Sequence, residues 1–259
     1  MNNGCAIMDL DSIAFTIGLG NKLLDEYGQP VRESGRFVYV DKSDEELLYC
    51  ADATMRTILT NSNADSYIAF IKGRGNYRYA INPEYKANRP KQSPKWWDYV
   101  KRYLVNSWGA VEVNNIEVDD AVNIARLQVP NSFIVAIDND LLALEGTHYN
   151  WRHNNLEGQW VAMTKEDAYY KFWFDMIKGQ SGDNIKGIPG YGPVAAEKIL
   201  SDSKCPPARI LKTYINVFGE ELGIDEFYKN YKSLLILSKY EGFVIPKPIQ
   251  VNKQTEEIV

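Results

Sequence analysis

Four short apolar runs that alternate with helical patterns constrain the fold most strongly. The runs are CAIM at 5–8, YIAFI at 67–71, AVEV at 110–113 and FIVAI at 133–137, and the helical patterns lie around 44–60, 95–107 and 117–127. Short apolar runs are typical of buried strands, and strand–helix alternation favours a parallel, doubly wound sheet. We therefore predict an α/β fold with a central, mainly parallel, twisted sheet flanked by helices.

The character of the chain changes near residue 164. The stretch HYNWRHNNLEGQWVAM predicts a hairpin with its turn at 152–158, and Thr164 is a suitable N-cap for an aromatic-faced helix over KEDAYYKFWFDMIKG. The remainder is helical in pattern, apart from a polar C-terminal tail that we expect to be frayed. We predict an α/β core over 1–163 and a helical C-terminal region over 164–259.

Composition excludes several classes of protein. No apolar run approaches the roughly 18 residues that span a bilayer, and the N-terminus lacks the pattern of a signal peptide. Three widely spaced cysteines disfavour a disulfide framework or a zinc cluster, so we expect a cytoplasmic, reduced protein. The net charge of −5 argues against a protein that merely coats nucleic acid. Carboxylates clustered around cations would still leave a basic face elsewhere.

Polar residues follow three of the expected strands directly. Asp9 follows the first run, Lys72 the second and Asp138 the last. In open α/β sheets, ligands bind beyond the carboxyl ends of the strands. We therefore expect a functional site at this edge of the sheet.

Acidic residues gather in four motifs near that edge. The motifs MDLDS, EVDD, IDND and GDN contain Asp9, Asp11, Glu117, Asp119, Asp120, Asp138, Asp140 and Asp183. Clustered carboxylates raise one another's pKa values, and the hard cations Mg²⁺ or Mn²⁺ relieve this repulsion. Two such ions can support phosphodiester hydrolysis. Each acid alone also suits a solvated surface or N-cap position, but their clustering favours a metal site.

A basic and aromatic stretch, KGRGNYRYAINPEYKANRPKQSPKWWDYVKRYL, lies between the second strand and EVDD. Basic residues interleaved with aromatic ones suit the phosphates and stacked bases of single-stranded nucleic acid. The alternative is a charged, solvated helix face. The residues that we predict to contact nucleic acid here are Lys72, Arg74, Arg78, Tyr85 and Lys91.

The glycine-rich stretch GDNIKGIPGYGPVAAEKIL occupies 182–200. Its match to G-x-G-x-x-A follows a helix rather than a strand, which disfavours a dinucleotide site, and a P-loop is absent. A helix, an IPGYG turn and a second helix favour a backbone grip on one phosphate of DNA. A monovalent cation such as K⁺ on the carbonyls of the turn is a further expectation. The residues predicted to contact DNA here are Gly187, Gly190, Gly192 and Lys198.

Four motifs in the same order resemble those of the 5′ nuclease superfamily. They are NPEYKANRP, EVDDAV, AIDNDLLAL and GDNIKGIPGYGPVAAEKIL, and the resemblance covers most of 5–240. The chain is most similar to bacteriophage 5′→3′ exonucleases and flap endonucleases and to the 5′-nuclease domain of bacterial DNA polymerase I. This resemblance implies a PIN-like core, a helical arch or clamp at about 84–105 that admits the 5′ strand, and a helix–turn–helix element at 187–193 that grips duplex DNA.

The resemblance also implies roles for individual residues. It implies that Lys86 and Arg89 are catalytic, because they match a basic pair that contacts the scissile phosphate. Implied partners are DNA with a free 5′ end or flap and a replication polymerase, with the protein a monomer, away from membranes, and in the host cytoplasm if it is of phage origin. The ligands implied for up to two Mg²⁺ or Mn²⁺ ions are Asp9, Glu117, Asp119, Asp120, Asp138, Asp140 and Asp183.

Two departures from the family's pattern each remove a carboxylate. Lys72 and Gln180 stand where the family commonly has Asp. We expect an active enzyme that holds at least one metal more weakly. Two other functions stay open: a DNA-junction binder of the same fold without strong catalysis, and a phosphatase that uses Asp9 or Asp11 as nucleophile.

Overall fold

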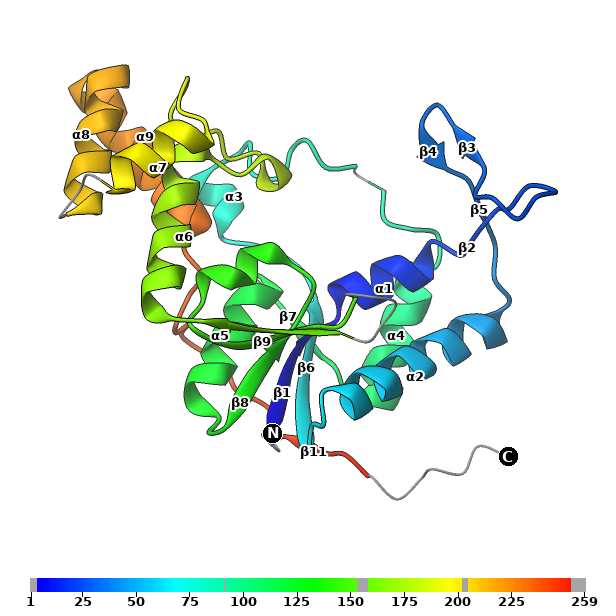
Figure 1. Cartoon of the computed structure of the whole chain (residues 1–259). Coiled ribbons are helices and arrows are strands. Elements are labelled where there is room, and N and C mark those ends of the chain that lie inside the picture. The colour runs from blue at the N-terminus through cyan, green and yellow to red at the C-terminus, as the bar shows by residue number, and fades with distance from the viewer. Residues whose placement is uncertain (1–3, 91, 153–157, 202–204, 253–259) are drawn as a thin grey trace.

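The computed structural model describes residues 4–90, 92–152, 158–201 and 205–252. Its body is a seven-stranded sheet between two layers of helices, and a group of helices extends from one side (Figure 1). Within the described residues, no helix is long and apolar enough to cross a membrane.

The strands confirm the predicted mainly parallel sheet. Its order is β10-β9-β8-β1-β6, with β7 and β11 both paired to β6; β9, β8, β1, β6 and β7 run parallel, and β10 and β11 are antiparallel. The strands of this sheet are β1 (Cys5–Asp9), β6 (Ser66–Lys72), β7 (Val111–Val113), β8 (Ser132–Val135), β9 (Gly146–Asn150), β10 (Gln159–Met163) and β11 (Ile249–Gln250).

The helices lie on both faces of the sheet and in the C-terminal group. They are α1 (Asp11–Gly18), α2 (Asp44–Asn61), α3 (Arg78–Ile81), α4 (Trp97–Trp108), α5 (Val118–Gln128), α6 (Lys165–Lys178), α7 (Pro193–Ser201), α8 (Pro206–Phe218) and α9 (Glu220–Leu234), with 3-10 helices η1 (Asn139–Ala143) and η2 (Ser181–Asp183).

Alternating side chains of the central strands build two cores. In β1, Ala6 and Met8 face α1, α2 and α4, while Ile7 faces α5, as the two-residue period of a strand requires. Both faces are buried, which is why the strand reads as a continuous apolar run. A third cluster joins α6 to α9 through aromatic side chains, among them Trp173 and Tyr214.

The expected arch differs from the structure. Residues 82–90 and 92–96 contain no helix, and α4, which we placed in the arch, packs against the sheet through Val100 and Leu104. Residues 82–90, which follow α3, lie on the side of the sheet where the parallel strands end (Figure 1). The resemblance implied an arch over 84–105, whereas the helical pattern around 95–107 had already predicted a helix that flanks the sheet.

The glycine-rich segment also differs from the expected helix–turn–helix. The helices α6 and α7 are separated by residues 179–192, which include η2, so no single tight turn joins them. The turn itself is short: the Tyr191 N–H donates to the Ile188 carbonyl at 3.0 Å.

The segment after α9 returns to the α/β body. Phe243 packs against Phe70 of β6 with ring centroids 5.9 Å apart, and β11 pairs with the start of β6. The frayed tail that we expected is therefore ordered to residue 252, and the rest lies outside the described residues.

An arm that the sequence patterns did not predict lies between α1 and α2. It contains β2 (Asn21–Lys22) paired with β5 (Tyr39–Val40), and β3 (Arg32–Glu33) paired with β4 (Arg36–Phe37). Figure 1 shows it projecting away from the body. The expected turn at 152–158 falls largely outside the described residues.

The burial of α4 leads to a stability prediction. We expect Leu104→Ala to lower the free energy of unfolding by about 2–5 kcal/mol, because it leaves a cavity in the core. The exposed neighbour Asn106→Ala should change it by less than about 0.5 kcal/mol. Urea unfolding measures both, and equal, small effects would contradict the packing of α4.

Candidate functional site

Three acids close the carboxyl ends of β1 and β8. Asp9 is the last residue of β1, and its Oδ1 accepts the Asp11 N–H at 2.8 Å. Asp11 in turn accepts the backbone N–H of Lys72 at 2.8 Å, which links α1 to the end of β6. After β8, Asp138 caps η1 by accepting the Asp140 N–H at 2.9 Å. Parallel pairing thus brings these acids to one edge, as predicted.

The N-terminus of α5 supplies the next acids. Glu117 is the N-cap, and Asp119 and Asp120 are in the first turn, where the helix dipole favours negative charge. The Glu117 N–H donates to Asp120 Oδ2 at 2.9 Å. Because α5 follows β7, its first turn opens at the same edge of the sheet.

Segment 82–89 lies against segment 181–186. The Lys86 N–H donates to the Asp183 carbonyl at 2.9 Å, and the Asn184 amide donates to the Glu84 carbonyl at 2.8 Å. Lys86 has a φ of +55°, which few non-glycine residues adopt. These contacts hold Lys86 beside the acids.

Lys86 and Arg89 neutralise two of the acids. Lys86 pairs with Glu117 and lies 3.6 Å from Asp183, and Arg89 contacts Asp183 at 2.5 Å. Burial opposes ionisation of Glu117, but Lys86 and then Arg78 lower its pKa overall. Burial lowers the pKa of Lys86, but Glu117 and Asp183 raise it overall. Both basic residues expected to be catalytic therefore lie in the acidic site.

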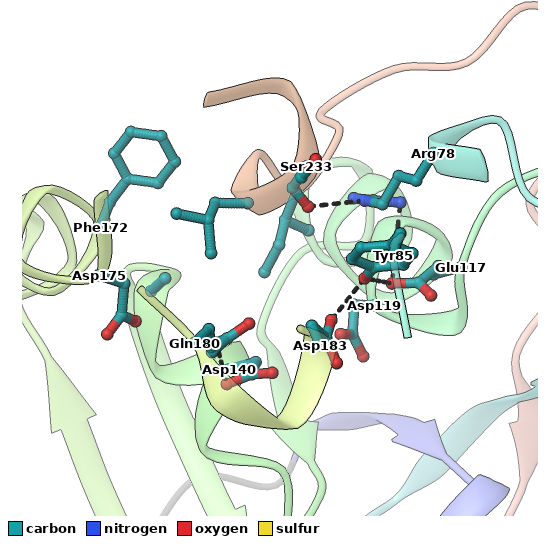
Figure 2. A pocket seen from close by; sticks show the side chains of 13 residues that line it. Arg78, Tyr85, Glu117, Asp119, Asp140, Phe172, Asp175, Gln180, Asp183 and Ser233 are labelled. Carbon is teal, nitrogen blue, oxygen red and sulfur yellow. Dashed lines mark hydrogen bonds and ion pairs between the residues drawn. The ribbon is translucent and has the colours of Figure 1, made fainter. Parts of the chain in front are cut away.

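Tyr85, which was predicted to contact DNA, is directed into the acidic site in this structure. Its side chain is 2% exposed, and its hydroxyl contacts Asp183 and, at 2.9 Å, Glu117 (Figure 2). Burial and these two carboxylates raise its pKa. Tyr85 is a wall of the site rather than a surface for stacking.

Arg78 and Asp120 are also placed differently from what was expected. Arg78 was expected to contact DNA and Asp120 to bind metal, but they form a buried bidentate pair at 2.6 and 2.8 Å. Each oxygen of Asp120 also accepts a backbone N–H group, that of Leu237 on Oδ1 and that of Glu117 on Oδ2. The separation of Arg78 and Asp120 by 42 residues left no local signal of this pairing.

The remaining acids carry charge that no neighbouring cation balances fully. Burial, and then Asp11, raise the pKa of Asp9 well above its usual range. Burial, Asp138 and Asp9 do the same for Asp119. Burial, Asp138 and Asp183 raise the pKa of Asp140 to about 7.

This set of donors fits a hard divalent cation. All the donors are carboxylate oxygens, and their repulsion would fall if a cation lay among them. Within the described ranges, however, no three acids are already arranged around a common point that would hold an ion. Glu117 and Asp183 are directed to Lys86 and Arg89 instead. Asp140 is held by the Gln180 amide, which donates to it (Figure 2).

The other predicted DNA contacts fall into three groups. Gly187 is buried where its backbone crosses Gly179, and an added Cβ would lie 2.4 Å from the Gly179 nitrogen, so its role is close packing. The side chain of Lys91 lies outside the described residues. Five others are exposed and stay predictions: Lys72, Arg74, Gly190, Gly192 and Lys198.

Sequence reasoning missed two polar residues at the site. The Asn76 amide donates to Glu117 at 2.9 Å. Asp175 is buried beside the pocket that Asp140 and Gln180 line, between Lys171 and Lys178. In the sequence, Asp175 has the spacing of an ordinary helical ion pair, and Asn76 lies in a loop, so neither gave a signal.

The raised pKa values lead to a pH prediction. An acid whose pKa is raised by folding stabilises the protein below its unfolded pKa, and this stability is lost as pH rises through its folded pKa. With a chelator present to remove metal ions, we expect Asp119→Asn to raise the free energy of unfolding by more than about 0.5 kcal/mol at pH 8. The free energy of unfolding should also decrease less between about pH 4 and 8 in this variant than in the parent. Thermal melts measure this. The exposed variant Asp225→Asn is the control, and an equal response of both variants would contradict the burial of uncompensated charge.

Comparisons with known proteins bear on the family and the fold of the chain. No protein-family model matches the chain. It is 27% identical over 226 residues to the 5′-3′ exonuclease of Mycoplasmopsis pulmonis (strain UAB CTIP), which covers 80% of this chain and 72% of the relative. It is 26% identical over 186 residues to the exodeoxyribonuclease of Enterobacteria phage T3, covering 62% of this chain and 60% of the relative.

Solved structures share the fold at low sequence identity. T5 5′-exonuclease with bound zinc aligns with a TM-score of 0.57 and 16% identity, over 89% of this chain and 86% of that one. The catalytic core of Rad2 in complex with DNA substrate aligns with a TM-score of 0.51 and 14% identity. This alignment covers 91% of this chain and 76% of that one. In sequence the chain is thus similar to 5′→3′ exonucleases, and its fold is that of the 5′ nucleases, as its four motifs indicated.

Proposed function

We propose that this protein is a divalent-metal-dependent 5′→3′ exonuclease and flap endonuclease that hydrolyses DNA phosphodiesters near a free 5′ end. The observation that carries the proposal is that buried acids without a full counter-charge lie beside two basic side chains at one edge of the sheet. Asp9 and Asp119 have raised pKa values there, and Lys86 and Arg89 are directed into the same space. The relatives named as exonucleases support the reaction class.

The residues proposed to hold Mg²⁺ or Mn²⁺ are Asp9, Glu117, Asp119, Asp138, Asp140 and Asp183. When bound, two divalent ions would supply Lewis acidity and a lowered pKa for water in phosphodiester hydrolysis. The T5 structures, one with zinc and one co-crystallised with metal ions, support divalent metal use. A K⁺ ion at the turn after Ile188 stays a prediction.

Lys86 and Arg89 are proposed to bind the phosphate at the cleaved bond. In the structure they bind Glu117 and Asp183, so they are already fixed within reach of the acids. Divalent ions bound by those acids would take over their charge, and the side chains of Lys86 and Arg89 would then be available to bind the phosphate oxygens, where charge increases during hydrolysis.

The exposed face of the C-terminal region is proposed to bind the duplex. Gly190 and Gly192 are exposed, and a Cβ on either would meet no atom within 4 Å, so a phosphate can approach their backbone closely. Lys198 is an exposed residue of α7 and adds a positive charge. The DNA complex of Rad2 supports a DNA partner for this fold.

Removing Lys86 tests the catalytic proposal. We expect Lys86→Ala to lower kcat for cleavage of a 5′-labelled flap by about 10²–10³-fold at saturating Mg²⁺, because one group that stabilises developing charge is lost. KM for the DNA should change much less. The control is Lys247→Ala, an exposed lysine beside β11 at the opposite end of β6. A kcat equal to that of the parent would exclude Lys86 from the chemistry.

Restoring a carboxylate tests the proposed weakness of one metal position. We expect Gln180→Asp to lower the Mg²⁺ concentration at half-maximal rate by about tenfold, because it adds an oxygen donor in place of the amide bound to Asp140. Lys72→Asp is the comparator at the end of β6. Titrations of cleavage rate against Mg²⁺ measure both, and identical metal requirements in all three proteins would contradict the idea.

A second candidate function is a DNA-junction binder with little or no catalysis. The observation that favours it is the Gln180 amide on Asp140, which occupies an acid that would otherwise face a metal. Incubation of a 5′-labelled duplex with Mn²⁺ separates the two candidates. Retained binding without any cleavage would support the binder.

A further inference from the structure

The C-terminal end of α9 is joined to the acidic end of α5 by one buried ion pair. Arg78 is 2% exposed and Asp120 is fully buried. The two guanidinium Nη atoms donate to the two carboxylate oxygens at 2.6 and 2.8 Å, the bidentate geometry that fixes both groups. Neither group is used by the proposed reaction.

The remaining donors of Arg78 bind the end of α9. Its Nε donates to the Ser233 carbonyl at 3.0 Å, and Nη2 donates to the Leu235 carbonyl at 2.6 Å. Carbonyls at a helix C-terminus have no partner within the helix. Arg78 therefore satisfies carbonyls at the end of α9 and holds that helix beside α5.

Asp120 makes the matching contacts on the other side. Its Oδ1 accepts the Leu237 N–H at 2.8 Å, and its Oδ2 accepts the Glu117 N–H at 2.9 Å. The Asn123 amide, one turn further along α5, donates to the Leu237 carbonyl at 3.0 Å. One carboxylate thus binds both the chain after α9 and the backbone of a proposed metal ligand.

The side chain of Glu117 belongs to the same network. Arg78 Nη1 lies 3.8 Å from Glu117 Oε2. Asn76 links the two residues a second time, because its Oδ1 accepts the Arg78 N–H at 2.9 Å and its Nδ2 donates to Glu117 at 2.9 Å. A displacement of Arg78 would therefore disturb Glu117 in two ways, through their direct contact and through Asn76.

Stability alone does not explain a pair of this kind. Burying two charges costs solvation, and well-packed apolar residues often serve equally well for stability. What apolar residues cannot do is hold a backbone N–H of Glu117 and two helix-end carbonyls in one arrangement. The contacts therefore point to orientation as the role of the pair.

We propose that Arg78 and Asp120 are positioning residues that orient Glu117 for metal binding and make this orientation depend on the docking of α9. The inference rests on the proposed metal-binding function of Glu117. It links the C-terminal helices, which are proposed to bind duplex DNA, to the acids through residues that touch neither DNA nor metal.

The test is the double variant Arg78→Met/Asp120→Leu, which removes both charges and keeps a buried apolar volume. Mn²⁺ binding to the protein without DNA is measured by electron paramagnetic resonance, below the melting temperature of each variant. We expect the Kd for Mn²⁺ to rise by about 10–100-fold. At saturating Mn²⁺, kcat should fall while KM for DNA stays near the parent value, because the exposed duplex surface is unchanged.

The control double variant is Arg56→Met/Asp52→Leu, which removes an Arg–Asp pair on α2 that touches no residue of the site. It should leave the Mn²⁺ affinity unchanged. The single variant Arg78→Lys keeps the charge but loses the bidentate contact of the guanidinium group. We expect it to weaken Mn²⁺ binding less than the double variant does.

A parent-like Mn²⁺ affinity in the folded double variant would overturn the proposal. If the double variant does not fold, a parent-like affinity in folded Arg78→Lys overturns it equally. The proposed function fails by a different result, which is a parent protein that binds Mn²⁺ and does not cleave DNA.

Discussion

Repulsion between carboxylates at the carboxyl edge of the sheet is the constraint on which the rest of the site depends. Parallel pairing of β1 and β8, with α5 following β7, brings acids from distant parts of the chain to one edge. The protein balances part of their charge with its own cations, since Lys86 and Arg89 bind Glu117 and Asp183. Asp9 and Asp119 have raised pKa values, first because they are buried and then because other carboxylates lie near them. A site of this kind gains stability when a cation enters.

The basic residues near the site divide into two kinds with different roles. Arg78 is buried, carries four hydrogen bonds and holds the structure together. Lys86 and Arg89 are on a segment between α3 and α4 and are more exposed, so they can exchange carboxylate partners for a phosphate. Arg78 links α5 to the end of α9 through these contacts, whereas Lys86 and Arg89 are the residues that we propose to act on the substrate.

Sequence patterns predicted the parts of the fold that depend on local periodicity. The run YIAFI predicted β6, because a strand with both faces buried is apolar throughout. The acids that follow the strands predicted the edge of the sheet at which the site lies. The patterns failed where a partner lies far along the chain. Arg78 resembles a surface base among aromatic residues until Asp120 is seen beside it, and β11 has only two residues, too few for a period. The helical pattern around 95–107 predicted a helix beside the sheet, and the burial of Val100 and Leu104 in α4 confirms it.

The central claim is that these acids form a divalent-cation site. The most direct measurement is a crystal structure of the protein soaked in Mn²⁺, with anomalous scattering used to locate each ion and its ligands. We predict at least one ion bound by oxygens of Asp9, Asp119 and Asp138 or their neighbours, with Lys86 displaced from Glu117. An absence of anomalous density, with Lys86 and Arg89 still bound to the acids at saturating Mn²⁺, would contradict the claim.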